Sequence, residues 1–163
     1  MRKTFTVQAS APVGAPAEVV YNIIADYRKG HPHILPRKYF EWLEVEQGGR
    51  GDGTVIRFQM RVFGQTRVLR AVVTEPDPGR VIVETDTGGI GPVTTFTVEP
   101  SDAGSDVTIS TELTSAGGLL GIAERFVLRR ILRRVYAAEL KQLESVAVER
   151  TAVRTVAYWA SYA

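Results

Sequence analysis

The fold of this chain is decided by residues 119–148, LLGIAERFVLRRILRRVYAAELKQLESVAV, the only stretch long and periodic enough for a helix of many turns. Between Ile122 and Val148 there is no glycine or proline that would end a helix. At 1.5 Å per residue, such a helix is about 45 Å long. It cannot bury its apolar side alone, so it needs a large apolar surface to lie against.

The two sides of this predicted helix differ in polarity. Apolar residues recur at steps of three, four and seven, which predicts one buried stripe. The stripe contains Leu120, Val127, Leu128, Ile131, Leu132, Val135, Ala138, Leu140 and Leu143. The opposite side is expected to be a solvated flank, with Glu124, Arg129, Arg130, Arg133, Arg134, Glu139, Lys141 and Glu144.

The preceding chain predicts the surface that this helix covers. Residues 2–11 alternate between apolar and polar, as in a half-buried strand. The tetrapeptide Ala15-Pro16-Ala17-Glu18 then predicts a short helix that ends near Asp26. A second short helical turn before Pro32 competes with a loop there. Six more strands are predicted over residues 40–47, 54–64, 66–75, 80–85, 93–99 and 106–114.

This order of elements predicts an α+β domain in which a seven-stranded, curved antiparallel sheet wraps around a long C-terminal helix. Two short helices follow the first strand. Small residues such as Ala71 and Ala123 on the facing surfaces are compatible with a hollow centre. Ordinary close packing remains the alternative, since composition alone does not separate the two.

The bulk composition excludes several classes of protein. The 163 residues fit one domain, and 44% hydrophobic with 23% charged residues is far from a disordered composition. The absence of cysteine removes disulfides, thiolate metal sites and cysteine nucleophiles. No segment has the apolar length of a signal peptide core or a membrane span, so a cytoplasmic location is expected.

The basic residues are unevenly distributed. A net charge of +2 is too small to indicate nucleic-acid binding, and we expect no nucleic-acid partner. Five arginines nevertheless fall within ten residues, at positions 125, 129, 130, 133 and 134. A solvated helix face is the favoured interpretation, and contact with an anionic membrane or partner is the minor alternative.

The chain resembles a known family in several of its turns and segment boundaries. The stretch Ala15-Pro16-Ala17-Glu18-Val19-Val20-Tyr21 with Ile24-Ala25-Asp26-Tyr27 resembles the start of the START-like (SRPBCC) superfamily, specifically its polyketide cyclase/dehydrase and lipid-transport group. Further similarity lies in Gly51-Asp52-Gly53-Thr54, in residues 73–80, and in residues 104–108. The resemblance covers nearly all of residues 1–148, which we take as the ligand-binding domain.

The resemblance implies the helix-grip (Bet v 1-like) fold, with a mainly apolar cavity between the sheet and the C-terminal helix. It therefore implies that the chain binds or transports a small hydrophobic ligand, such as a lipid or a polyketide. Strand parity, and position on the helix for the last residue, give the expected ligand-binding residues. These are Phe58, Met60, Leu69, Phe96, Ile109 and Phe126.

An enzyme of the polyketide cyclase or dehydratase type is the alternative function. No catalytic residue can be carried over from the family, and the weak candidates for proton transfer are His31, Tyr39 and Glu112. His31 and His33 are expected to be a solvated loop pair, while Glu112 is expected to face outward with its even-numbered neighbours. A third metal ligand is missing from the pattern, so we expect neither a metal nor another cofactor.

Residues 149–163 form a C-terminal extension beyond the resemblance. Val153, Val156 and Ala160 keep helical spacing, and Tyr158, Trp159 and Tyr162 crowd the end. We expect this segment either to continue the helix or to pack back on the domain. Its aromatic residues favour a homodimer contact, because tryptophan and tyrosine are common interface anchors.

Overall fold

The computed structural model describes residues 2–62 and 64–160, apart from the side chains of residues 62, 159 and 160. The elements are β1 (Lys3–Val13), α1 (Ala17–Ala25), α2 (His31–Ile34), β2 (Phe40–Gln47), β3 (Val55–Val62), β4 (Gln65–Asp77), β5 (Val81–Asp86), β6 (Val93–Ser101), β7 (Gly104–Ser115) and α3 (Gly118–Ala160).

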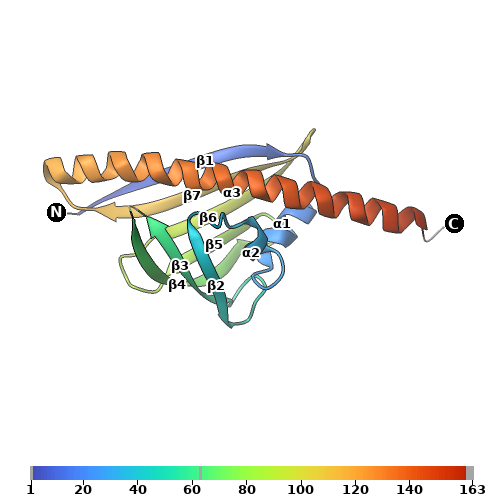
Figure 1. Cartoon of the computed structure of the whole chain (residues 1–163), viewed down its shortest axis with the longest axis horizontal. Coiled ribbons are helices and arrows are strands. Elements are labelled where there is room, and N and C mark those ends of the chain that lie inside the picture. The colour runs from blue at the N-terminus through green and yellow to red at the C-terminus, as the bar shows by residue number, and fades with distance from the viewer. Residues whose placement is uncertain (1, 63, 161–163) are drawn as a thin grey trace.

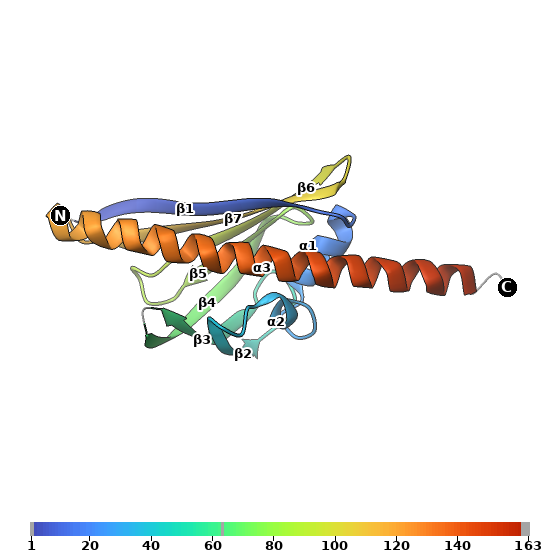
Figure 2. The same cartoon turned by 45° about the horizontal axis from the view of Figure 1, so that its top comes forward.

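The strands form one antiparallel sheet in the order β1-β7-β6-β5-β4-β3-β2. The sheet closes its meander by pairing the first strand with the last, from Lys3 opposite Ser115 to Val13 opposite Ser105. The sheet curves, and α3 runs across it along the whole length of β1 and β7 (Figure 1, Figure 2). The predicted α+β class, the seven strands and the long C-terminal helix are confirmed.

The alternation of side chains along the strands fixes which face of the sheet is covered. Ile56 on β3 and Val73 on β4 are buried, while Arg57 and Arg70 lie on the outer face. On that outer face Arg70 Nε lies 2.6 Å from Glu46 Oε2 of β2. A sheet with one buried face specifies its register strongly, because a slip by one residue would expose every buried side chain.

The two short helices close one end of the sheet. Pro16 precedes α1, which buries Val20, Ile23 and Ile24. The chain then turns tightly: a Cβ at Gly30 would lie only 2.3 Å from the carbonyl oxygen of Ile23, so only glycine fits there. The helix α2 starts directly after this turn at His31.

The long helix buries the predicted stripe only in its middle, where Leu132, Val135, Leu140 and Leu143 are buried as expected. Its buried side chains are Leu132, Val135, Tyr136, Glu139, Leu140, Leu143 and Ala147. Leu120 and Val127 were expected in the stripe, but they are 84% and 38% exposed. The reason is that only the middle of α3 lies over the hollow of the sheet, whereas its first turns lie at the far end of the molecule (Figure 1).

The C-terminal extension continues α3 without a break as far as Ala160. Val153 and Val156 are exposed, and Arg150 Nη2 donates to the carbonyl oxygen of Lys29 at 2.7 Å. Tyr162 and the side chain of Trp159 lie outside the described residues, so the homodimer contact stays a prediction. Within the described part of the chain, no helix combines the length and apolarity that crossing a membrane requires.

Candidate functional site

A cavity of about 70 Å³ lies between the concave face of the sheet, α2 and the middle of α3. Its wall is made by His31, Leu35, Phe40, Leu43, Ile56, Phe58, Met60, Leu69, Glu84, Thr94, Phe96, Ile109, Tyr136 and Glu139. In this conformation the cavity has room for a few water molecules. A larger ligand would need the half-buried side chains of the wall to move.

The structure places five of the six predicted ligand-binding residues in this wall. Phe58, Met60, Leu69, Phe96 and Ile109 all line the cavity, each from the face that strand parity assigned to it. That these residues contact a ligand stays a prediction. The placement of Phe126 was wrong: its side chain is 69% exposed, because the first turns of α3 do not cover the hollow.

Two of the three candidate proton-transfer residues lie away from the cavity. Glu112 is exposed on β7, opposite Thr6 of β1, as its parity predicted. Tyr39 is half-buried before β2, with the Lys38 ammonium 5.4 Å from its ring, and it is not part of the cavity wall.

The third candidate, His31, is buried in the cavity wall, with 2% of its surface exposed. The prediction of a solvated histidine pair was therefore wrong for His31, although His33 is exposed. The His31 ring stacks on Tyr27 at 4.5 Å between centroids and meets the edge of Phe96 at 5.5 Å. Its Nδ1 lies 2.8 Å from the carbonyl oxygen of Ile24. A carbonyl only accepts, so Nδ1 carries a hydrogen and Nε2 is the nitrogen left for other partners.

Glu84 on β5 lies close to that nitrogen. Its Oε1 lies 3.7 Å from His31 Nε2 and accepts a hydrogen bond of 2.7 Å from the hydroxyl of Tyr27. Burial, and then the charge of Glu84, raise the pKa of Tyr27 well above its ordinary value. Tyr27 therefore stays protonated and acts as a hydrogen-bond donor to Glu84.

Glu139 of α3 is the second carboxyl group in the wall, and sequence reasoning missed it. It was expected on the solvated flank, yet it is 3% exposed, and its Oε1 has no hydrogen-bond partner in the described structure. Burial, and then the charge of Glu84, raise its pKa well above the ordinary value. Because an isolated buried carboxylate is costly, burial favours the neutral carboxylic acid form of Glu139. The signal in the sequence was its spacing, three residues after Tyr136 and four before Leu143.

A chain of hydroxyl groups completes the polar part of the wall. The hydroxyl of Tyr136, also on α3, donates to Thr111 Oγ1, which lies 2.9 Å from Thr94 Oγ1. Burial raises the pKa of Tyr136, which keeps its hydroxyl protonated. An apolar hollow with a few converging polar groups is the usual form of a small-molecule site.

The comparison with protein families agrees with this architecture. The profile of the family described as polyketide cyclase / dehydrase and lipid transport matches residues 4–148. The chain belongs to this family. The predicted family assignment is thereby confirmed, and the match ends where the C-terminal extension begins.

Solved structures of similar fold extend over nearly the whole of this polyketide cyclase/dehydrase and lipid transport domain. The KanY protein is 27% identical, with a TM-score of 0.77, over 89% of this chain and 98% of that one. The Zhui aromatase/cyclase from Streptomyces sp. R1128 is 24% identical, with a TM-score of 0.72, over 91% of this chain and 96% of that one. Ara h 8.0201 is 16% identical, with a TM-score of 0.62, over 90% of this chain and 99% of that one. These similarities confirm the helix-grip fold. A comparison with curated proteins gives no significant match.

The cavity of this family member adjoins a second depression on the surface, which we call the side groove. It has a volume of about 390 Å³ and shares Met60 and Leu69 with the cavity wall. Its other residues are Gln65, Arg67, Ile90, Gly91, Pro92, Leu113, Thr114, Glu124, Leu128 and Leu132. The side groove and the cavity therefore lie on either side of the Met60 and Leu69 side chains.

Among the described residues, no three side chains of the metal-ligating types are close enough together to hold a metal ion. This holds although His31, Glu84 and Glu139 line the same cavity.

The buried acid gives the stability of the protein a pH dependence that Glu139→Gln should remove. Folding raises the pKa of Glu139. The contribution of Glu139 to the free energy of unfolding is therefore fully present below its pKa in the unfolded chain, about 4.3, and is lost as the pH rises through its pKa in the folded protein. Glutamine keeps the size and shape of the glutamate side chain but has no carboxyl group that can ionise. We expect the variant to gain a few degrees in melting temperature over the parent protein at pH 8, and this gain to shrink toward pH 4.

Thermal unfolding followed by circular dichroism from pH 4 to pH 8 measures this difference. Glu144→Gln is the matched control, because Glu144 is exposed on the same helix. A Glu139→Gln variant that follows the parent protein at every pH would show that Glu139 ionises freely in the folded state.

Proposed function

We propose that this protein binds a small, largely apolar molecule that carries a carbonyl or hydroxyl group, in the cavity between the sheet and α3. The observation that carries the proposal is Glu139, a neutral buried acid with an unpaired oxygen in an otherwise mainly apolar wall. A buried polar atom without a partner is costly, and a ligand that hydrogen-bonds to it would remove that cost.

The rest of the wall supports the same class of ligand. Phe58, Met60, Leu69 and Ile109 offer apolar and aromatic surface for a hydrocarbon or polycyclic skeleton. Hydroxyl and imidazole groups from Thr94, Tyr136 and His31 lie in the same wall and would orient the polar substituents of the ligand. Membership of a family described by lipid transport as well as by polyketide cyclisation is in keeping with this chemistry.

A bulky residue in the wall tests this proposal. Leu69→Trp is expected to fill the space that Leu69 shares between the cavity and the side groove, and to lower uptake of an apolar fluorescent dye at least tenfold. Val68→Trp is the matched control, because Val68 directly precedes Leu69 on β4 and is 47% exposed on the outer face. Dye titrations of the two variants and the parent protein make the comparison. Equal dye affinity in all three would contradict ligand binding in this cavity.

Acid–base catalysis on the bound molecule is the second candidate function, and a specific observation favours it. Burial raises the pKa of Glu139 and so favours its protonated form, and His31 presents Nε2 in the same cavity wall. A protonated acid and an imidazole nitrogen are the two groups that enolise a ketone: the acid donates to the carbonyl oxygen while the nitrogen accepts a proton from the adjacent carbon. The Zhui aromatase/cyclase, which has a similar fold, adds support to this alternative.

A further inference from the structure

We propose that the first turns of α3 dock on an anionic membrane surface, with the opening of the side groove at the docked end. The docking surface has two parts. The apolar tip consists of Leu119, Leu120, Ile122 and Phe126, and the arginine band consists of Arg129, Arg130, Arg133 and Arg134. The route of the ligand in this inference rests on the proposed binding function, whereas the docking itself does not.

The apolar tip is unusual for a surface. Its four side chains are exposed by 85%, 84%, 55% and 69% in chain order. They lie in the first two and a half turns of α3, at one extreme of the longest axis of the molecule (Figure 1). Soluble monomers seldom leave several large apolar side chains together in water. Because the tip ends the molecule and is not a groove, it suits insertion into a soft apolar layer better than it suits gripping another chain.

The arginine band supplies positive charge that would complement the negative phosphate groups of such a membrane. All four arginines are exposed, and none of the ion pairs found among the described residues involves them. Steps of four and three from Phe126 place Arg130 and Arg133 on the same side of the helix. The guanidinium of Arg129 lies 5.6 Å from the ring centroid of Phe5. An apolar end followed by a band of cations matches the order of acyl chains and phosphate groups in an anionic leaflet.

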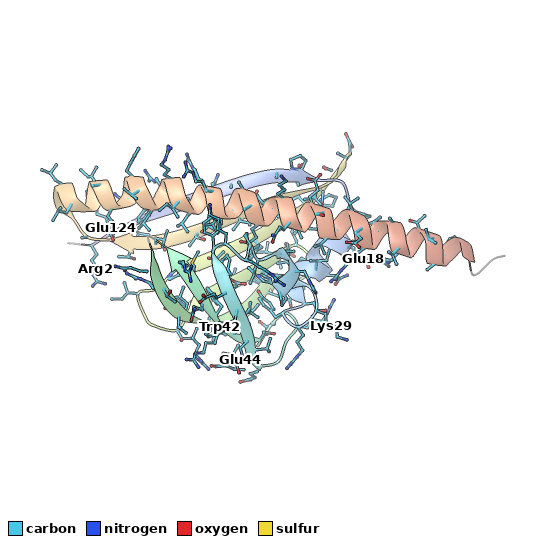
Figure 3. The ribbon with its side chains drawn as sticks, viewed as in Figure 1. Arg2, Glu18, Lys29, Trp42, Glu44 and Glu124 are labelled. Carbon is cyan, nitrogen blue, oxygen red and sulfur yellow. The ribbon has the colours of Figure 1, made fainter. Side chains whose placement is uncertain are left out.

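The same end carries further cations and an acid, among them Arg125, whose Nη1 donates to Ser115 Oγ at 3.0 Å. Arg2 and Lys3 are exposed at the start of β1, and Arg2 points out at this end (Figure 3). Glu124 is the acidic residue within the segment, and its Oε2 accepts from the backbone nitrogen of Ala116 at 3.4 Å. It lines the side groove together with Leu128 and Leu132. The groove therefore starts directly beside the apolar tip, so an apolar molecule could pass from the membrane to the cavity with little exposure to water.

Sedimentation with lipid vesicles tests the docking without any ligand. The parent protein is expected to sediment with phosphatidylcholine vesicles that contain phosphatidylglycerol, and not with phosphatidylcholine alone. Arg130→Gln combined with Arg134→Gln should weaken the partition into anionic vesicles roughly thirtyfold. Leu120→Ser combined with Phe126→Ser should weaken it by about tenfold or more.

The control is made at the other end of the same helix. Arg154→Gln combined with Val156→Ser changes the same kinds of residue, and Val156 is as exposed as Phe126, at 69%. This variant should bind vesicles like the parent protein. All variants are checked for an unchanged circular dichroism spectrum, because exposed positions should tolerate these changes.

Three outcomes overturn the proposal. In the first, the parent protein does not bind vesicles. In the second, it binds neutral and anionic vesicles equally. In the third, the variants of the apolar tip or of the arginine band bind vesicles as well as the control variant does. Light scattering covers a fourth: a dimer that the tip variants make monomeric would assign the tip to a second copy of the chain. Dye uptake in solution is measured separately. A protein that takes up dye but ignores vesicles refutes docking alone, and one that binds vesicles but no dye refutes only the proposed ligand-binding function.

Discussion

In the Glu139→Gln variant, the exchange of hydrogen for deuterium at the acidic carbon of a bound 1,3-diketone is expected to slow by roughly a hundredfold or more. In enolisation, the carbonyl oxygen receives a proton while the carbon next to the carbonyl group loses a proton. Glu139 is buried in the cavity wall, and its raised pKa favours the protonated form that can supply this proton, whereas an amide cannot. Glutamine keeps the size of the side chain, so binding of the diketone should change far less than the rate.

The exchange is followed by proton NMR in deuterated buffer, with benzoylacetone as the probe. Glu144→Gln controls for the loss of a carboxyl group elsewhere on α3. His31→Gln should also slow exchange if Nε2 is the base. A parent protein that leaves the diketone exchanging at the rate of buffer alone would exclude this acid–base chemistry, and binding would remain as the function to be tested.

Leu143→Ala is expected to destabilise the folded protein by about 3 kcal/mol, the other large effect. Leu143 is 1% exposed in the middle of the stripe that α3 buries. Removing its branched end would lose apolar burial and leave a void that rigid neighbours cannot fill. Since small domains are stable by only about 5–15 kcal/mol, this one change would take a substantial part of the total.

Urea unfolding followed by circular dichroism measures this loss as a lower midpoint at an unchanged slope. Leu119→Ala makes the same chemical change on the same helix, where the side chain is 85% exposed, and should alter stability by less than about 0.5 kcal/mol. Similar losses in both variants would mean that the first turn of α3 is packed in solution against something that covers it.

Much of the fold and part of the site follow from local patterns in the sequence. The two-residue period of the strands assigns Phe58, Met60, Leu69, Phe96 and Ile109 to one face, and all five line the cavity. Strand parity predicts this placement because each side chain of a strand points either toward the covered face of the sheet or toward its outer face. The absence of glycine and proline from Ile122 onward likewise determines one long helix, and that helix continues to Ala160.

The polar half of the site was decided by the tertiary structure alone. A helix can turn about its axis by small angles, so its buried stripe depends on where the sheet and α2 lie. This rotation buries Glu139 and Tyr136, while the position of the helix along the sheet exposes Phe126. A tight turn at Gly30, closed by contact with Ile23, moves His31 from an expected loop surface into the cavity wall. Strand parity is a local property of the backbone, but the burial of a charged or polar side chain depends on contacts between distant segments. The sequence by itself therefore determined the fold and the apolar wall, and the packing of α3 and α2 determined which acid and which histidine line the cavity.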